Sequence, residues 1–168
     1  VVIFVIVGDV FVVDDIREQG MTSLLVTPAR GRLAVARLVV LAGTGLVFAS
    51  VLVGASLAAC PTTSTAALWA GGRTVVWLTA ALLLAAGLGE ALRSVIGAAT
   101  VAVVLVILAP QLAMFAGDIA RWLPGQAAQI WVAAAAPQTD VTAAGLAALG
   151  WTTAAQAAGI ARLLRADA

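Results

Sequence analysis

LVVLAGTGLVFASVLVGASLAA, residues 38–59, decides the class of fold, because the run holds no charged residue over its whole length. A helix needs about 20 largely apolar residues to cross about 30 Å of hydrocarbon, and this run is long enough. Similar runs follow it along the chain. The sequence therefore predicts an all-α, polytopic transmembrane helix bundle in a single domain. Its predicted parts are the end of a spanning helix at 1–13, a charged cytoplasmic segment at 14–33, complete spanning helices at 34–59, 73–90, 95–116 and 141–161, and an outer segment at 117–139.

The composition favours lipid as the solvent for most side chains. Hydrophobic residues make up 63% of the 168 residues and charged residues 10%, whereas an ordinary soluble domain is about 25% charged. A soluble domain of this length needs more polar surface than the composition supplies. The net charge of +1 disfavours nucleic acid as a partner, because phosphate binding needs a dense basic face.

The missing residue types exclude most enzymes. The chain has no histidine and no lysine. Without histidine there is no Ser-His or Cys-His nucleophile pair and no common zinc site, and without lysine the phosphate-binding loop of ATPases cannot be built. We therefore expect no catalytic residue, no metal site and no cofactor, and an intramembrane enzyme is disfavoured. Cys60 is the one cysteine, so no disulfide forms within the chain, and we interpret it as a small apolar residue.

The arginines predict the orientation, because short cytoplasmic loops collect positive charge. With residues 14–37 inside, the C-terminus is also cytoplasmic, and two arginines, Arg73 and Arg121, lie outside. The cytoplasmic arginines are then Arg17, Arg30, Arg32, Arg37, Arg93, Arg162 and Arg165. This distribution predicts a multi-pass protein of the inner (plasma) membrane. Segment 1–13 lacks the basic start and the cleavage site of a signal peptide, so we interpret it as the end of a helix that begins before the sequence does.

The outer segment and the tryptophans fit this layout. Pro124 and Pro137 bracket a run too short to cross, which predicts an interfacial or re-entrant helix, with an ordinary extracellular loop as the alternative. Tryptophans near the outer ends of spans are expected at the headgroup level: Trp69, Trp77, Trp122 and Trp131. Trp151 lies within the last span, where we expect it to pack against a neighbouring helix.

Small residues recur every four positions in the first complete span, a spacing that lets another helix approach closely in lipid. Because alanine and glycine are abundant throughout the chain, chance is an equal alternative. These residues are Gly45, Ala49, Ser50, Gly54 and Ala58.

The charged segment DDIREQGMTSLLVTPARGRLAVAR, residues 14–37, predicts a short cytoplasmic helix lying on the membrane. Asp14 is a good N-cap, and Pro28 ends the helix because it disfavours the helical conformation of the residue before it. Arg30 and Arg32 would then lie at the headgroup level, and Arg37 can extend its charge out of the next span. A loop that merely follows the positive-inside rule and contacts nothing is the alternative.

The stretch REQGMTSLLVTPARGRLAVARL resembles the first cytoplasmic loop of ABC transporter permeases of the type 2 exporter class. GLGEALRSVIGAATVAVVLVILAP resembles the short inner turn of that bacterial family, RWLPGQAAQ its outer segment and ARLLRADA its basic tail. The resemblance covers essentially the whole chain, although a family member has six spans. The matching loop positions are Arg17, Glu18, Gly20, Thr22, Leu24, Leu25, Pro28, Arg30 and Arg32.

The resemblance implies a permease subunit of an ATP-driven exporter. A separate ABC ATPase subunit would supply ATP hydrolysis, and a second permease copy, identical or not, would complete the transport path for an apolar or amphipathic substrate. Residues 14–33 would be the coupling helix that docks on the ATPase. The partner-binding residues would be Arg17, Glu18, Gly20, Met21, Leu24, Leu25, Pro28 and Arg30.

Three other charged positions need an interpretation. Asp9 lies in an apolar segment, and an intramembrane acid is a candidate for the transport path. Glu90 and Asp118 each precede an arginine by three residues, which predicts local pairs in turns, Glu90 with Arg93 and Asp118 with Arg121. The main rival to a permease is a non-transporting integral membrane protein that assembles or anchors a complex.

Overall fold

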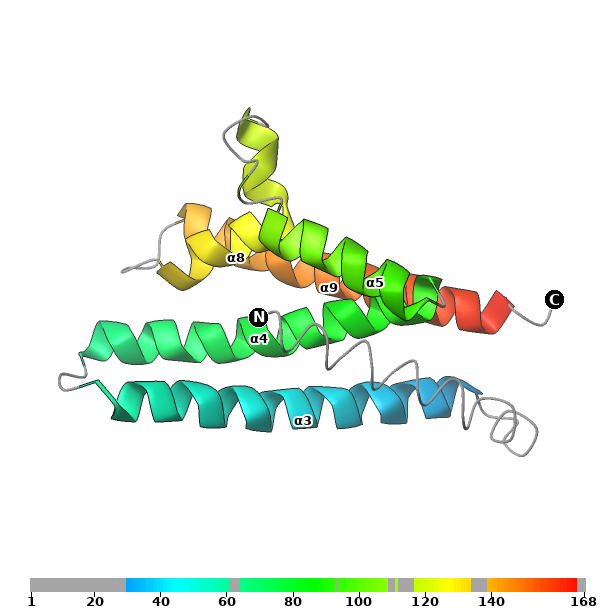
Figure 1. Ribbon diagram of the computed structural model, residues 1–168, viewed down its shortest axis with the longest axis horizontal. Coiled ribbons are helices and arrows are strands. Elements are labelled where there is room, and N and C mark those ends of the chain that lie inside the picture. Colours follow the sequence, from blue (N-terminus) through cyan, green and yellow to red (C-terminus); the bar gives the residue numbers. More distant parts are fainter. Residues whose placement is uncertain are drawn as a thin grey trace.

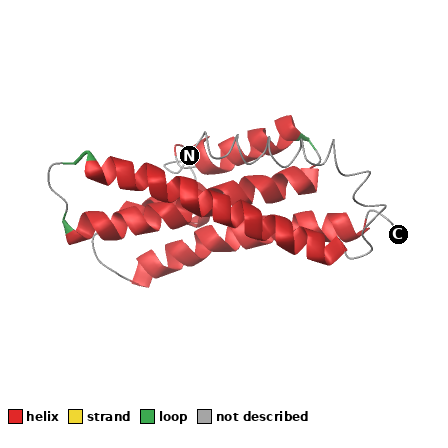
Figure 2. Ribbon diagram, turned by 90° about the horizontal axis from the view of Figure 1, so that it is seen from below, coloured by secondary structure: helices red, strands yellow, loops and turns green. Residues whose placement is uncertain are grey.

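The computed structural model describes residues 30–60, 64–92, 94–108, 111, 117–133 and 139–165, and every element within these ranges is a helix (Figures 1 and 2). This confirms the predicted all-α class. The α-helices are α3 (Arg30–Ala58), α4 (Thr65–Leu92), α5 (Val95–Val103), α8 (Pro124–Ala133) and α9 (Thr139–Arg165). A π-helical turn, η1 (Val104–Leu108), continues α5, and a 3-10 helix, η2 (Gly117–Trp122), precedes α8.

Two serines begin helices by accepting a hydrogen bond from the first turn. The Ala67 N–H donates to Ser64 Oγ over 3.2 Å at the start of α4, and the Gly97 N–H donates to Ser94 Oγ over 3.1 Å at the start of α5. Ser94 has an extended backbone, as an N-cap residue does. The chain therefore leaves α4 and enters α5 within a few residues, so the two helices run in opposite directions side by side.

The bundle is organised around α4. This helix contacts α3 on one side and α9 on the other, while α5 and α8 complete its surroundings (Figure 1). α3 packs against α4 and makes no other extensive contact among the described elements. The main core lies between α4, α9, α8 and the α5–η1 helix, and α3 adds a smaller apolar contact on the opposite face of α4.

Small side chains make up most of this core. Leu84 and Pro124 are its largest fully buried residues, and alanines account for much of the rest. Small residues let helix backbones approach closely, which is how helices associate in lipid, where no hydrophobic force drives them together. The completely buried alanines are Ala49, Ala81, Ala85, Ala98, Ala102, Ala127 and Ala148.

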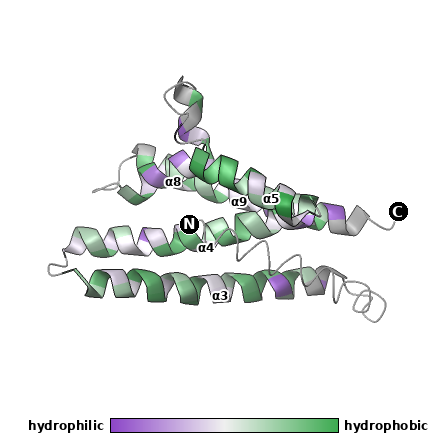
Figure 3. Cartoon of the chain, in the orientation of Figure 1, coloured by the Kyte–Doolittle hydropathy of each residue, from purple (hydrophilic) through white to green (hydrophobic). Residues whose placement is uncertain are grey.

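Two helices of the described part are long and apolar enough to cross a membrane: Ala34–Ala58, with a mean hydropathy of 2.3 over its most apolar stretch, and Thr65–Leu92, with 1.9. These correspond to the first two of the four predicted spans. The third, at 95–116, is described as the shorter apolar helix Ile96–Leu108, which includes the π-helical turn. α9 has 27 residues but is less apolar than α3 and α4, as the whiter ribbon of Figure 3 shows.

Candidate functional site

The last residues of the predicted coupling segment, 30–33, belong to α3. Arg30 is the first residue of that helix, so the structure shows which helix the segment enters. Helical backbone includes the positions of Arg30 and Arg32 and starts four residues before the predicted start of the span at 34. The other predicted site residues lie outside the described part of the chain: Asp9, Arg17, Glu18, Gly20, Met21, Leu24, Leu25 and Pro28.

An ion pair links α3 to α4 at the end of the bundle where α3 begins. Arg37 Nη1 lies 3.4 Å from Glu90 Oε1, and the two side chains are 20% and 13% exposed. Arg37 is in the second turn of α3, and Glu90 is in the last turn of α4. We call this end of the bundle, with Arg37, Glu90 and Arg162, the arginine end.

A third helix reaches the same carboxylate. Gly159 of α9 lies so close that a Cβ there would be 2.8 Å from Glu90 Oε2 and 3.1 Å from the Gly87 carbonyl oxygen. Three residues further along α9, the Arg162 guanidinium donates to the Ala91 carbonyl oxygen. Glu90 is therefore the point at which α3, α4 and α9 meet.

Polar side chains of α9 donate to backbone carbonyls of α4. The Thr152 hydroxyl lies 3.3 Å from the Ala80 carbonyl oxygen and 3.3 Å from the Ala148 carbonyl oxygen of its own helix, so its one proton is shared between them. The Gln156 amide donates to the carbonyl of Leu83. Both side chains are buried. Together with the Arg162 bond, these contacts form a series along the α4–α9 interface. Thr152 and Gln156 are thus hydrogen-bonded inside the bundle and do not line a surface.

Glycine allows the two helices to come this close. A Cβ at Gly87 would lie 2.7 Å from the carbonyl carbon of Ala155 and 2.7 Å from the Gln156 nitrogen. Backbone atoms cannot move aside as a flexible side chain can, so the approach requires glycine at this position. The α4–α9 interface is consequently fixed by both polar bonds and backbone proximity.

α3 meets α4 through an apolar contact. A Cβ at Gly45 would lie 2.8 Å from the end of the Leu82 side chain, and Ala49 is completely buried beside it. The predicted small-residue face is therefore correct for these two positions. The prediction is wrong for Ser50, Gly54 and Ala58, which are exposed. Further along α3, the small residue at the contact between the two helices belongs to α4 and not to α3.

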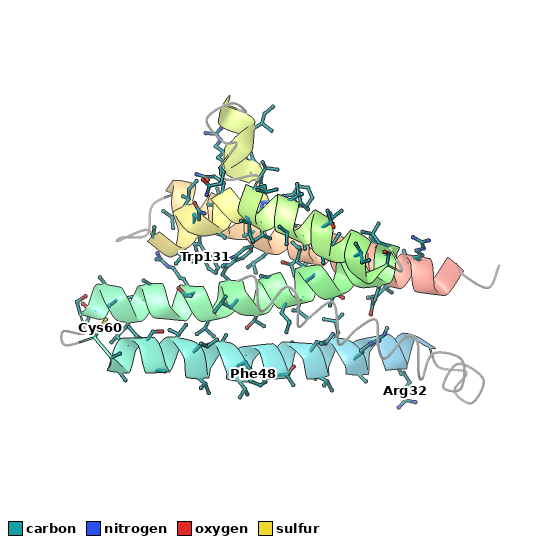
Figure 4. All side chains as sticks on the ribbon, viewed as in Figure 1. Arg32, Phe48, Cys60 and Trp131 are labelled. Carbon is teal, nitrogen blue, oxygen red and sulfur yellow. The ribbon has the colours of Figure 1, made fainter. Side chains whose placement is uncertain are left out.

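Further along α3, the side chains of Val53 and Leu57 lie over Gly71 of α4. A Cβ at Gly71 would lie 3.1 Å from Leu57 Cδ1 and 3.2 Å from Val53 Cγ1. The outer face of α3 carries large apolar side chains, and Figure 4 shows Phe48 on the side away from α4. The exposed residues on this face are Val35, Val39, Val40, Leu46, Val47, Phe48, Val51 and Leu52.

Toward the end of the bundle opposite the arginine end, Trp131 and Arg73 hold α8 in place. Arg73 Nη1 of α4 donates to the Trp131 carbonyl oxygen over 3.2 Å. Gly145 of α9 leaves room for the Trp131 ring, because a Cβ at Gly145 would lie 2.9 Å from Trp131 Nε1. The Trp131 side chain lies between α8 and α4 in Figure 4. These contacts hold α8 against both α4 and α9.

The other tryptophans divide between core and surface. Trp69 is 73% exposed, as a residue at a membrane interface would be. Trp77, by contrast, is 6% exposed and belongs to the core, so its expected headgroup position is wrong: α8 and α9 cover this face of α4. Trp151 packs by more than apolar contact, because its indole N–H donates to the Trp122 carbonyl oxygen over 2.9 Å.

Sequence reasoning missed the partner of Glu90. The structure pairs Glu90 with Arg37, 53 residues away; the expected pair with Arg93 lies outside the described residues. The signal that pointed to the correct partner was topological: both residues were predicted at the cytoplasmic ends of consecutive, antiparallel spans. Near Asp118, the Arg121 guanidinium lies over the Trp122 ring, 5.6 Å from its centre.

Among the described residues, the arginine end holds one carboxylate, that of Glu90, which is paired with Arg37 and lies against the backbone of α9. No group of three or more metal-binding side chains occurs in the residues that the structure describes. The chain matches no family model, no curated protein and no solved structure. The resemblance to type 2 exporters accordingly stays a prediction.

Proposed function

We propose that this chain is the membrane-spanning permease subunit of an ATP-driven ABC exporter of the type 2 class. A separate ATPase subunit docks on residues 14–33, a second permease copy completes the path, and the exported substrate is apolar or amphipathic. The sequence resemblance supplies this class. The structure supports it through the connection between the docking segment and the helix bundle.

The observation that carries the proposal is the position of Arg37. The docking segment runs into α3, and within its second turn α3 is joined through Arg37 to Glu90 of α4. Through Gly159, Glu90 lies against α9. A displacement of the docking segment therefore acts first on α3 and then, through the ion pair and the apolar α3–α4 contact, on the α4–α9 interface. A coupling device between an ATPase and a permease requires such a connection.

The distribution of hydrophobicity supports lipid as the solvent. α3 has the higher mean hydropathy, 2.3 against 1.9, yet 11% of its most apolar stretch is buried, compared with 56% for α4. In water the more apolar helix is expected to be the more buried one. The opposite order is expected in a bilayer, where large apolar side chains face lipid and small residues face other helices.

The arginines support a cytoplasmic position for the arginine end. Arg37 and Arg162 lie there, and Figure 4 shows Arg32 at the same end of α3, opposite Cys60. By the positive-inside rule this end faces the cytoplasm of the inner membrane. The C-terminus is then cytoplasmic, and α9 and the predicted span at 95–116 are the further spans of a multi-pass bundle.

In the proposed mechanism, ATP binding closes two ATPase subunits on each other. The docking segments move with them, and α3 transmits that motion to the spans, which shifts the population between two arrangements of the path. The chain's own contribution is mechanical, and the chemistry of ATP belongs to the partner.

The test is co-purification. A tagged form of the protein is expressed in its native host at natural level, extracted in mild detergent, and the proteins bound to it are identified by mass spectrometry. Leu24→Asp with Leu25→Asp removes the apolar contacts of the docking segment, and Leu24→Met with Leu25→Met is the matched control that retains them.

We expect wild type and the methionine variant to retain an ATPase that carries a phosphate-binding loop, and the aspartate variant to lose it while still inserting. If wild type retains no such ATPase, or if the aspartate variant retains it equally well, the permease proposal is wrong. Association of wild type with other membrane proteins alone would favour the rival function, an assembly or anchoring subunit.

A further inference from the structure

The two faces of α4 are held by different kinds of contact. On one face, α9 is joined by the bonds from Thr152, Gln156 and Arg162 and by the backbone approach at Gly87. On the other face, α3 is joined by an apolar contact and by the Arg37–Glu90 ion pair. α4 and α9 thus form one unit, to which α3 is attached laterally.

Separating α3 from this unit costs less in lipid than it would in water. The contact surface consists of side chains such as Leu78 and Leu82 of α4 and Ala49 of α3. When these part in a bilayer, lipid tails replace them, and lipid tails are as apolar as leucine, so no hydrophobic free energy is lost. Among the described residues, van der Waals packing and the ion pair then hold α3 to α4.

We propose that the Arg37–Glu90 ion pair is a conformational latch, which keeps α3 against the α4–α9 unit and lets the start of α3 move away when it opens. This goes beyond the proposed function, because the latch is a property of the chain alone and needs no ATPase. In a permease it would be the point at which a pull on the docking segment is first resisted.

The position of the pair suits repeated opening. It joins the first turns of α3 to the last turn of α4, and both side chains retain some exposure. Such a pair is weaker than a fully buried one, because water or headgroups can solvate the separated charges. The long arginine side chain can extend to a lipid headgroup once it leaves Glu90.

Gly159 of α9 keeps the carboxylate directed toward Arg37. A Cβ at this position would lie 2.8 Å from Glu90 Oε2 and 2.9 Å from Glu90 Cβ, so alanine must displace the Glu90 side chain. Gly159→Ala therefore disturbs the latch without removing either charge. Gly150, on the same helix, has no atom within 4 Å of a Cβ, and Gly150→Ala is the matched control.

The experiment measures the distance between α3 and the α4–α9 unit by double electron–electron resonance in lipid nanodiscs. Exposed Cys60 is replaced by serine, and spin labels are attached to Val39→Cys on α3 and Ile96→Cys on α5. A second label pair, Ile96→Cys with Leu146→Cys of α9, reports on the rest of the bundle. All three labelled positions are exposed.

In the distance distribution of the 39–96 label pair, we expect Glu90→Gln and Gly159→Ala each to raise the ratio of the long-distance to the short-distance population by about fivefold. An effect of this size is what a part-exposed ion pair supports. Gly150→Ala should match the parent. The charge exchange Arg37→Glu with Glu90→Arg should restore the short distance. The 96–146 distance should not change.

The proposal of a latch is wrong if Glu90→Gln leaves the 39–96 distances unchanged. It is also wrong if the 96–146 distances change equally, because the ion pair would then support the whole bundle rather than the position of α3. Neither result bears on whether an ATPase binds, so failure of the latch and failure of the proposed function are distinguished.

Discussion

α3 and α4 are nearly equal in length, 29 and 28 residues, and both are long and apolar enough to cross a membrane, yet they occupy opposite situations. Among the described elements, α4 is in contact with four others, whereas α3 has one extensive neighbour. Valine, leucine and phenylalanine cover the exposed face of α3, while alanine and glycine predominate among the buried residues of α4. In lipid, residue size therefore indicates which helix has protein neighbours, and hydrophobicity does not.

The largest effect is expected where α4 meets α9. Gly87→Leu places a side chain against the Ala155 and Gln156 backbone, which cannot yield, so we expect a loss of more than about 3 kcal/mol in the free energy of unfolding, measured by denaturant titration in detergent. Gly72→Leu is the control, because a Cβ at Gly72 has no atom within 4 Å. Equal losses for the two variants would mean that α4 and α9 do not approach closely.

A smaller loss is expected between α3 and α4. Ala49→Leu adds bulk at a completely buried position beside Leu78 and Leu82, and we expect a cost of about 2 kcal/mol in the same titration. Since α3 can shift outward into detergent, the cost stays below that of Gly87→Leu. Ser50→Leu, at the neighbouring exposed position, should leave the midpoint unchanged; a loss as large as that of Ala49→Leu would contradict the helix orientation.

The polar bonds between α9 and α4 are expected to contribute less each. Gln156→Leu removes the donor to the Leu83 carbonyl, and we expect a loss of about 1 kcal/mol, in the range measured for hydrogen bonds between membrane helices. Thr153→Val is its control, because the exposed Thr153 hydroxyl bonds within its own helix, to Gly150. If both variants cost the same, the α9 donors do not hold the two helices together.

The smallest effect is expected on the outer face of α3. Phe48 is 66% exposed, and Phe48→Ala should change the free energy of unfolding by no more than about 0.5 kcal/mol. A loss of about 2 kcal/mol would instead show that a protein surface, such as a second copy of the chain, covers this face in the assembled state. In that case the surroundings of α3 would be closer to those of α4, because α3 would then have two protein neighbours.

The sequence was sufficient to predict the helical class and the position of α3, because an uncharged run of about 20 residues has few other solutions. The second span was predicted at 73–90, whereas α4 already begins at Thr65. The sequence also placed Arg37 and Glu90 at the same end of the bundle. It did not predict that they pair, since that depends on which faces two helices present to each other. The Arg93 expectation took the nearest opposite charge along the chain instead.

Other features depended on contacts that no local pattern specifies. Trp77 looked like an interfacial residue because tryptophan is common there, but packing of α8 and α9 on α4 buries it. Thr152 and Gln156 are polar residues within the last predicted span, and they have partners among the backbone carbonyls of a helix about 70 residues earlier. Backbone acceptors are present at every position, so the sequence gives no sign of which ones are used.

The use of carbonyls by Thr152, Gln156 and Arg162 has an evolutionary consequence. An acceptor that belongs to the main chain survives any substitution that leaves the helix intact, so α4 is free to exchange side chains at positions 80, 83 and 91 as far as these bonds are concerned. The donors on α9 have no such freedom. Among related sequences we expect positions 152, 156 and 162 to be restricted to hydrogen-bond donors, without paired changes on α4.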